Sequence, residues 1–475
     1  MGLSDSARLR GGLWQARARA AGRDAARAGG DHERRVALQG NARSSGRRMT
    51  DDSRQRHAQR TQLQVSHSLR AHQRAWFADL QQRVADGAPY VLTSPIAPHE
   101  IFEALDIPFV TDAWYSGLVA ARRQSAHFSQ VMTDHGYHDG LRRYTALGLG
   151  VVLDEDHPDK PWGGLPRAAA VVSTNDGGGG AAELARRWDV PFLGLDQPVM
   201  RVMHPDWWSM QRRQWEDYDE PDRIDLMVAQ FEDVVTLGER IAGKRLDRAR
   251  LAEIVDRVNR QEEHFDAIRR IIIEAPKLPA RLGEVMSQTM GIQWHRGTEW
   301  ALAQAAAFHA EVRARADAQQ WVCPGERHRL MYVGAGLWQK LDFFDSFEES
   351  HGAVFVRSNY LSIASDGYLR YNYGDDPMRA LASRYTALAK QMWIPPLGGA
   401  WAVHEARTHR VGGALQLDSS RGIGFITRAL TEAGIPVLDL PVDPVDARRW
   451  NDDEMRALVG NFIETKLDSG MKECS

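Results

Sequence analysis

Short apolar runs alternate along most of the chain with stretches whose apolar residues recur at helical spacing. Apolar runs bounded by glycine, proline or polar residues predict buried strands, and apolar residues spaced three or four apart predict amphipathic helices. The predicted strands lie at residues 89–92, 106–110, 169–172, 190–195, 329–333, 351–356, 409–417 and 434–440. The predicted helices lie at residues 63–84, 98–105, 140–150, 181–188, 224–272 with a break at 243–247, and 423–433. This alternation predicts an α/β protein with two doubly wound, Rossmann-like lobes and a helical insert between them.

The predicted elements divide the chain into four parts. Residues 1–60 are rich in Arg, Ala and Gly and poor in large apolar side chains, so we expect a disordered N-terminal extension. Met49 is a candidate for the natural start of the protein. We place the first α/β lobe at residues 61–205, the helical insert at 206–325 and the second α/β lobe at 326–475.

The stretch from Ala168 to Pro198 predicts one β-α-β unit with a polar, glycine-rich turn after its first strand. Ligands of open parallel sheets lie beyond the carboxyl ends of the strands, so Asn175 and Asp176 lie where binding or chemistry is expected. Gly177 and Gly178 belong to a run of four glycines that lets the backbone approach a ligand such as a phosphate closely. The run matches neither a dinucleotide-binding nor a Walker-type motif, so a plain flexible turn stays an alternative.

Polar and aromatic residues also follow the other predicted strands. We take as candidate binding residues Ser94, Trp114, Tyr115, Ser116, Asn359 and Ser419. Aromatic side chains at a strand tip more often form a pocket wall than a core, which is our expectation for Trp114 and Tyr115. His99 and Glu100 begin the helix after the first strand and complete the binding set; we expect His99 to face the solvent, with a role as a base as the alternative.

Composition excludes several classes of protein. The net charge is -3 and the pI is near 6.6, so we expect no nucleic-acid partner and no anionic membrane partner. No apolar stretch approaches the roughly 20 residues of a membrane span. Only Cys323 and Cys474 are present, and neither has a metal-binding spacing, so we expect a cytoplasmic protein with no disulfide framework and no metal site. Fifteen tryptophans make an aromatic-lined pocket a reasonable expectation.

The order of these features resembles the subunits of 2-hydroxyacyl-CoA dehydratases and benzoyl-CoA reductases from Pro89 to Leu467. The residues that carry the resemblance in the first half are Pro98, Glu100, Ile101, Ala104, residues 141–148 around Tyr144, Leu165, Pro166, residues 173–176, Val190, Pro191, Leu195, Asp196 and Pro198. Those in the second half are residues 243–247, Asn259, residues 352–356, residues 434–438, Asp443, Arg448 and residues 462–464.

The resemblance implies two Rossmann-like lobes, a heterodimer with a second homologous subunit, and an acyl-CoA thioester bound beside a [4Fe–4S] cluster. It also implies three cluster cysteines at strand ends, near Arg142, near Asn175 or Asp176, and near Ser419 or Ser420. None of these positions is cysteine, and the oxygen and nitrogen groups present are poor substitutes for soft thiolates. We therefore predict that this chain holds no cluster and no other cofactor, the CoA thioester being its substrate.

Three interpretations remain open. In the first, the chain acts on an aromatic or dicarboxylic acyl-CoA by non-radical lyase or isomerase chemistry, as in anaerobic aromatic metabolism. Its predicted catalytic residues are Arg142, Tyr144, Asp176, Ser420 and Arg421, the arginines binding a carboxylate and Asp176 transferring a proton. In the second, it is a catalytically silent partner subunit that completes the acyl-CoA site of a cluster-bearing sibling. In the third, these residues only cap strands and helices.

Overall fold

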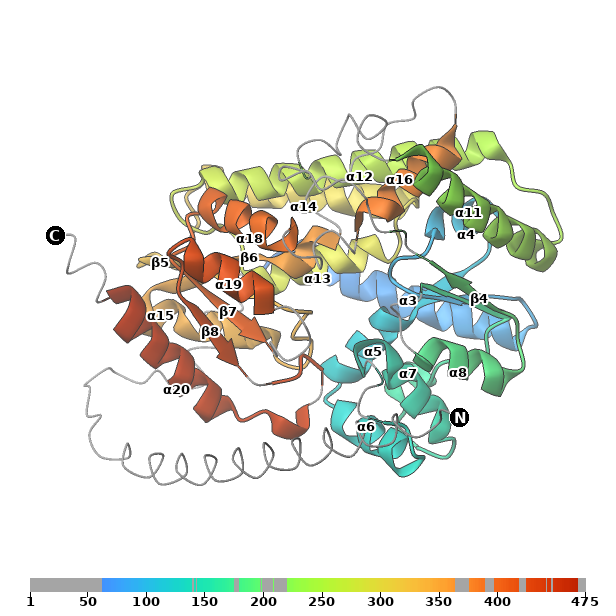
Figure 1. The fold of residues 1–475 in the computed structure, drawn as a ribbon, viewed down its shortest axis with the longest axis horizontal. Helices are drawn as coiled ribbons and strands as arrows, with labels where there is room; N and C mark the ends of the chain where they lie inside the picture. The colour runs from blue at the N-terminus through green and yellow to red at the C-terminus, as the bar shows by residue number, and fades with distance from the viewer. Residues whose placement is uncertain are drawn as a thin grey trace, which may run out of the picture. The chain divides into compact units, whose positions relative to one another are not determined.

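A computed structural model shows two four-stranded parallel sheets, each covered by helices, and a group of long helices between them in sequence (Figure 1). It describes residues 62–138, 141, 143–174, 179–196, 198, 208, 220–363, 376–388, 397–417, 424–440, 442–445 and 447–468. The predicted α/β class with two Rossmann-like lobes is confirmed. Within the described residues, no helix combines the length and the apolar character that a bilayer span requires.

The first sheet has the strand order β2-β1-β3-β4, with every neighbouring pair parallel. Its strands are β1 (Val91–Thr93), β2 (Phe109–Thr111), β3 (Ala170–Thr174) and β4 (Phe192–Leu195). Its helices are α4 (His99–Ala104), α5 (Asp112–Ala121), α6 (Ser125–Asp134), α7 (Arg143–Leu153) and α8 (Gly179–Trp188), with a 3-10 turn at Pro161–Gly163. β1, β2 and β3 are buried along their whole length because helices cover both faces of a parallel sheet, which is why they read as apolar runs.

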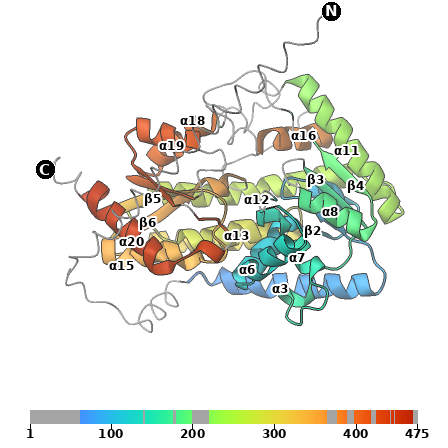
Figure 2. The ribbon, with the colours of Figure 1, turned by 60° about the horizontal axis from the view of Figure 1, so that its bottom comes forward.

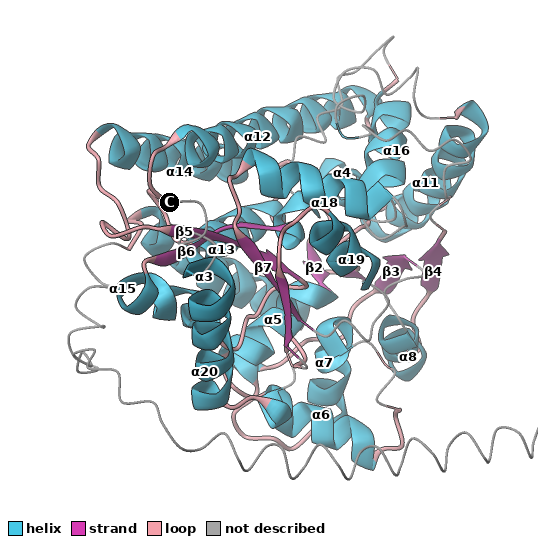
Figure 3. Cartoon of the chain, turned by 60° about the vertical axis from the view of Figure 1, so that its left-hand side comes forward, coloured by secondary structure: helices cyan, strands magenta, loops and turns pink. Residues whose placement is uncertain are grey.

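The second sheet repeats this design with the order β6-β5-β7-β8. Its strands are β5 (His328–Val333), β6 (Ala353–Ser358), β7 (Gly413–Leu417) and β8 (Val437–Leu440). Its helices are α15 (Glu348–His351), α18 (Leu397–Thr408), α19 (Gly424–Glu432) and α20 (Asp452–Phe462). α16 (Pro377–Leu388) follows β6 in sequence but packs on the long helices α11 and α12. Shorter helical turns lie at Leu341–Phe347 (η3), Asn359–Ile363 (η4), Ala447–Arg449 (η6) and Ile463–Leu467 (η7). Figure 3 shows the strands of the two sheets as separate groups.

The long helices between the sheets are α11 (Pro221–Ala242), α12 (Arg248–Glu274), α13 (Leu282–Gln293) and α14 (Glu299–Asp317). α12 and α14 lie side by side (Figure 1). The predicted break between α11 and α12 is confirmed: α11 ends at Gly243 in the left-handed conformation, and the Asp247 carboxylate accepts hydrogen bonds at the start of α12.

The first described helix, α3 (Val65–Ala85), packs against α13 (Figure 2) and also against α14. The backbone N–H of Leu63 donates to Glu284 Oε1 at 2.6 Å, and that of Val65 donates to Glu311 Oε2 at 3.0 Å. Gly291 of α13 lies against Leu69, where an added Cβ would come within 2.8 Å of the leucine methyls. Two segments of the chain that are far apart in sequence thus form one packed unit.

All eight predicted strands are confirmed, with shifted boundaries. The largest shift concerns the strand predicted at 409–417, which begins only at Gly413. α18 runs to Thr408, and Arg410 then takes a positive φ of 59° that reverses the chain before β7. His409 and Arg410 therefore belong to a turn.

Candidate functional site

Each sheet has a topological switch point between its two inner strands. In the first sheet the chain moves from β1 outward to β2, returns to β3 and moves outward on the other side to β4. In the second sheet β5 and β7 are the corresponding inner strands. A crevice that binds ligands forms at the carboxyl ends of such a strand pair, so the segments after β1, β3, β5 and β7 are the candidate site.

Eight predicted site residues lie outside the described residues. They are Arg142, Asn175, Asp176, Gly177, Gly178, Ser419, Ser420 and Arg421. The elements around them are described: Asn175 to Gly178 come directly after β3, and Ser419 to Arg421 come after β7. Both segments therefore follow inner strands of their sheets, and Arg142 directly precedes α7.

Ser94 lies at the first switch point and joins the two inner strands. Its hydroxyl is 3.2 Å from Thr174 Oγ1 and accepts a hydrogen bond from the backbone N–H of Thr174 at 3.1 Å. The Ser94 N–H in turn donates to Val172 O at 3.1 Å. This side chain is fully buried, so its contacts in the structure are with β3.

His99 is fully buried, so the expectation that it faces the solvent is wrong. Its Nε2 lies 3.0 Å from Thr93 Oγ1 and 3.0 Å from Ser94 O, and its ring stacks on Phe109. Burial, together with the positive charge of Arg296, lowers the pKa of His99 well below its ordinary value. The imidazole is therefore neutral and ties α4 to the end of β1.

Glu100 is held in a buried ion pair between α4 and the segment after α13. Arg296 Nε donates to Glu100 Oε1 at 2.9 Å, and both side chains are about 1% exposed. Tyr385 of α16 donates to Ala97 O at 2.6 Å and contacts Glu100 Oε2 at 3.2 Å. This arrangement gives the Glu100 carboxylate a structural contact, and its assignment to substrate binding stays a prediction.

Trp114, Tyr115 and Ser116 were expected at a strand tip, and this placement is wrong. β2 ends at Thr111, whose hydroxyl accepts a hydrogen bond from the Trp114 N–H at 3.2 Å and so starts α5. Trp114 packs in an aromatic group, and Tyr115 donates to Pro161 O at 3.1 Å. All three are buried in α5, so they form core rather than pocket wall.

Tyr144 contacts two aromatic residues of the second lobe. It lies in the first turn of α7, and its hydroxyl donates to the Tyr360 hydroxyl. Trp338 Nε1, in the segment after β5, donates to Tyr144 Oη at 2.7 Å. Gly117 of α5 also packs on the Trp338 ring. A Cβ added at this glycine would lie 3.4 Å from the ring. We call Tyr144, Trp338 and Tyr360 the junction triad.

Asn359 positions the two segments that carry the junction triad in the second lobe. Its Oδ1 accepts a hydrogen bond from the Gly334 N–H at 2.9 Å, which joins the ends of β5 and β6. Gly334 has a φ of +144°, a conformation that glycine adopts without strain. Tyr332 closes the same segment by donating to Ala335 O.

Burial and the neighbouring Tyr144 raise the pKa of Tyr360 well above its ordinary value. Burial and the neighbouring Tyr144 also raise the pKa of Tyr332 well above its ordinary value. Both hydroxyls therefore keep their protons at neutral pH.

The sequence offered weak signals for this part of the site. Tyr144 was predicted, whereas Trp338 and Tyr360 were missed. Tyr360 follows β6 after one residue and so had a strand-end position, but its contact with Tyr144 spans 216 residues.

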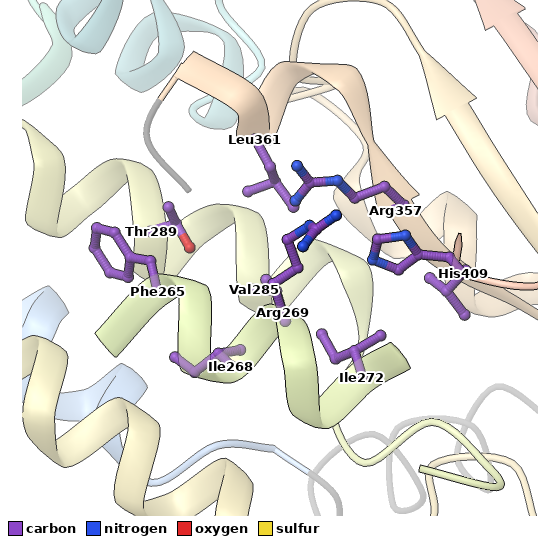
Figure 4. Close-up of a pocket in the computed structure, with 10 residues that line it drawn as sticks. Phe265, Ile268, Arg269, Ile272, Val285, Thr289, Arg357, Leu361 and His409 are labelled. Atoms are coloured by element: carbon purple, nitrogen blue, oxygen red, sulfur yellow. The ribbon is translucent and has the colours of Figure 1, made fainter. Parts of the chain in front are cut away.

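A second buried polar cluster joins α12 to the second lobe. Glu405 of α18 pairs with Arg269 of α12 and, at 2.7 Å, with Arg357 of β6. Figure 4 shows the two guanidinium groups close together with His409 beside them, around a cavity of about 10 Å³, roughly the size of one water. Burial alone would raise the pKa of Glu405, but Arg357 and Arg269 outweigh it and hold this pKa well below the ordinary range. Burial lowers the pKa of His409 to about 3.

The sequence was compared with protein families and with curated proteins. A family model described as 2-hydroxyglutaryl-CoA dehydratase, D-component, matches residues 96–465. The match covers both sheets except for β1 and includes every residue of the junction triad. No curated protein matches the chain.

Proposed function

Because the chain belongs to the 2-hydroxyglutaryl-CoA dehydratase D-component family, we propose that it is a dehydratase-like subunit that binds an acyl-CoA thioester between its two lobes. The observation that carries this proposal is the junction triad. Tyr144 comes from the first lobe, and Trp338 and Tyr360 come from segments that follow strands of the second lobe. Polar groups from both lobes thus meet at this contact, and one of them, Trp338, comes from the segment after the inner strand β5, where doubly wound sheets bind ligands.

The junction triad supplies a hydrogen-bond donor for the thioester carbonyl. The hydroxyls of Tyr144 and Tyr360 carry one proton each, and the hydrogen bond between them uses the proton of Tyr144. Within the described parts of the chain, no acceptor takes the proton of Tyr360. This proton is suited to polarise the carbonyl oxygen, while Trp338 holds Tyr144 in place through its indole N–H.

The unplaced polar residues supply the remaining roles in the proposal. In sequence, Arg142 lies two residues before Tyr144, and Arg421 follows the inner strand β7. In the proposal, Arg142 and Arg421 bind the free carboxylate of a dicarboxylic acyl group. Asp176 is the proton donor or acceptor, and Ser420 provides a supporting hydroxyl.

A hollow of about 300 Å³ on the first lobe offers groups suited to the nucleotide end of CoA. Arg74 lies over the Trp162 ring at 5.9 Å, and Arg122 lines the same hollow. Helix α5 runs from the junction triad to this hollow. Gly117 packs on Trp338, and Arg122, at the end of the helix, lies roughly 8 Å further along the helix axis. Arginines and an exposed aromatic face are the groups that bind phosphates and a nucleobase.

The residues of this chain do not fit a [4Fe–4S] cluster. Such a cluster needs several thiolates, and the chain has two cysteines. Cys323 is buried, its Sγ lies 3.2 Å from Glu348 O, and burial raises its pKa to about 11, so it stays a neutral thiol. The proposed chemistry therefore uses no cluster held by this chain.

A catalytically silent partner subunit is the second candidate. It is favoured by the internal use of predicted site residues: Ser94, Glu100 and Asn359 contact other parts of this chain. Two measurements distinguish the active subunit from the silent partner. They are iron and sulfide analysis after anaerobic purification, and mass spectrometry of co-purifying subunits. Acyl-CoA turnover by the isolated chain supports the first candidate, and turnover only with a second subunit supports the other. Iron bound by this chain alone contradicts both.

The decisive binding experiment compares Tyr360→Phe with Tyr332→Phe. The first substitution removes the proposed donor, whereas Tyr332 donates to Ala335 O inside its own segment. We expect Tyr360→Phe to weaken acyl-CoA binding by about 1 kcal/mol in calorimetric titration, and Tyr332→Phe to leave it unchanged. Equal affinity of the Tyr360→Phe variant and the wild type would refute the role of the junction triad.

The acyl group is tested with paired esters of equal chain length. A dicarboxylic ester should bind more tightly than a monocarboxylic ester by about 1.5 to 3 kcal/mol, and Arg142→Met should remove that margin. If the variant keeps the full margin, Arg142 does not bind the carboxylate.

Arg74→Gln and Arg122→Gln, with exposed Arg83→Gln as the control, test the nucleotide end by their effect on the affinity for CoA itself.

A further inference from the structure

Two histidines and an aspartate lie together on the first lobe, at the ends of α6 and α7 away from the junction triad. His127 Nε2 is 2.7 Å from Asp154 Oδ2, and the His127 and His157 rings are 4.7 Å apart. One ligand atom from each residue lies within 4.8 Å of the other two. The three side chains come from α6, from the residue after the end of α7, and from the following loop.

The packing of α6 on α7 brings these residues together (Figure 1). Gly150 of α7 lies against Phe128 of α6 so closely that an added Cβ would come within 2.6 Å of Phe128 O. This close approach carries His127, the neighbour of Phe128, to the C-terminal end of α7, where Asp154 lies. The Phe128 ring also contacts the His157 ring at 5.2 Å.

The loop after α7 is fixed by its own hydrogen bonds. Gln124 Nε2 donates to Asp159 O at 2.7 Å, and Lys160 Nζ donates to Glu155 O at 2.7 Å. The Asp159 N–H donates to Nδ1 of His157 at 3.2 Å, so the ring is held close to Asp154. The ligand set is therefore largely preorganised, which lowers the entropic cost of binding an ion.

Electrostatics favour a cation at this position. The C-terminal end of a helix carries a partial negative charge, and Asp154 adds a full one directly after α7. The same loop contains Glu155, Asp156 and Asp159, against Lys160 and a 3.9 Å contact between Arg122 and Asp159. A divalent ion bound by Asp154 would offset this excess of negative charge.

We propose that His127, Asp154 and His157 form a binding site for a divalent transition-metal ion, with Zn²⁺ as the best-suited member of that class. Two imidazoles and one carboxylate match Zn²⁺, whereas Mg²⁺ and Ca²⁺ prefer oxygen ligands alone. The metal would replace the proton between His127 and Asp154. The His127 side chain is 48% exposed, so a fourth position remains open to water.

This site is independent of the acyl-CoA proposal. It would clamp α6, the end of α7 and the loop that leads to Trp162, because one ion would join residues that now share only one hydrogen bond and ring contacts. Its expected effect is therefore on the stability of the first lobe, with no role in the chemistry.

The test uses the full chain after treatment with a chelator. Zn²⁺ is titrated by calorimetry into the wild type, His127→Gln, His157→Gln and the control His135→Gln, an exposed histidine whose Nδ1 contacts Val131 O of its own helix. We expect one Zn²⁺ per wild-type and control chain, and binding at least roughly tenfold weaker in the other two variants. Zn²⁺ should also raise the melting temperature of the wild type and the control only.

Co²⁺ absorption provides a second measurement, since a bound Co²⁺ in a site of low symmetry gives a band that the aqueous ion lacks. Absence of Zn²⁺ binding by the wild type would overturn the proposal, and the His127–Asp154 contact would then be a simple hydrogen bond. Binding that persists in both His127→Gln and His157→Gln would assign the ion to other residues and equally overturn it.

Discussion

Glu405→Gln is expected to destabilise the protein strongly because Glu405 is the carboxylate that pairs with two buried guanidinium groups. Arg269 and Arg357 come from different parts of the fold, α12 and β6, and Figure 4 shows how close their ends lie. The glutamine keeps the size of the side chain and removes its charge. The two arginines then repel each other in a cavity that has room for about one water.

Removal of one partner of a buried ion pair costs about 3 to 5 kcal/mol, and we expect the upper part of this range because two cations lose their counterion. The matched control is Glu432→Gln at an exposed position of α19, which should change the free energy of unfolding by less than about 0.5 kcal/mol. Arg357→Met in the Glu405→Gln background should restore part of the loss, since it removes one of the two repelling charges.

The pH dependence gives an independent check. The folded-state pKa of Glu405 lies below its ordinary value of 4.5, so its contribution is present above pH 4.5 and is lost as the pH falls below it. The difference between wild type and Glu405→Gln should stay constant from pH 8 to about pH 6 and shrink below about pH 4.5. His409, with a folded pKa of about 3, destabilises both proteins as the pH falls below its unfolded value of 6.5, so it does not create the difference.

The assay is urea unfolding followed by tryptophan fluorescence, with the midpoint and the slope measured for each variant. A Glu405→Gln midpoint equal to that of Glu432→Gln would refute the reasoning, and so would a double variant that loses the full sum of the two single losses.

Three further predictions concern the first lobe. Gly150→Ala should cost about 1 to 3 kcal/mol in unfolding free energy, because its methyl group meets the Phe128 backbone, and a variant as stable as wild type would contradict the close packing of α6 and α7. Thr111→Ala removes the hydroxyl that accepts from the Trp114 N–H and should cost about 1 kcal/mol, measured by thermal unfolding, with Thr111→Ser recovering most of it. Gly178→Val should weaken acyl-CoA binding in calorimetry with an unchanged melting temperature, and equal affinity would leave Gly178 in a plain turn.

The strands could be predicted from sequence because parallel sheets covered on both faces leave a direct local trace. β3 and β5, for example, are buried at every position, and each contains an apolar run, at residues 170–172 and 330–333. The start of β7 was misplaced because His409 is also buried, by its contact with α18, and a buried turn residue resembles a strand residue in a pattern of hydrophobic positions.

The site was harder to predict because its contacts join distant segments. His99 was expected at the surface from its place in a helix first turn, but its ring packs on Phe109 of β2 and its Nε2 contacts Thr93 and Ser94. The neighbouring Glu100 pairs with Arg296, which lies 196 residues further along the chain. The same limit applies to Trp338 and Tyr360, and to His127 with Asp154. Aspartate and histidine three residues apart, as in Asp154 and His157, were a visible local signal, but the third ligand is set by the packing of α6 on α7.

The docking of α3 on α13 and α14 has a consequence for synthesis on the ribosome. Val65 contacts Glu311, 246 residues later, so α3 leaves the ribosome long before its partner helices exist. At roughly 5 to 20 residues per second, this delay is about 12 to 50 s. During that time Leu69, which packs on Gly291 of α13 in the finished protein, has no partner surface there. This helix is therefore a stretch of the nascent chain that chaperones would bind until α13 and α14 emerge.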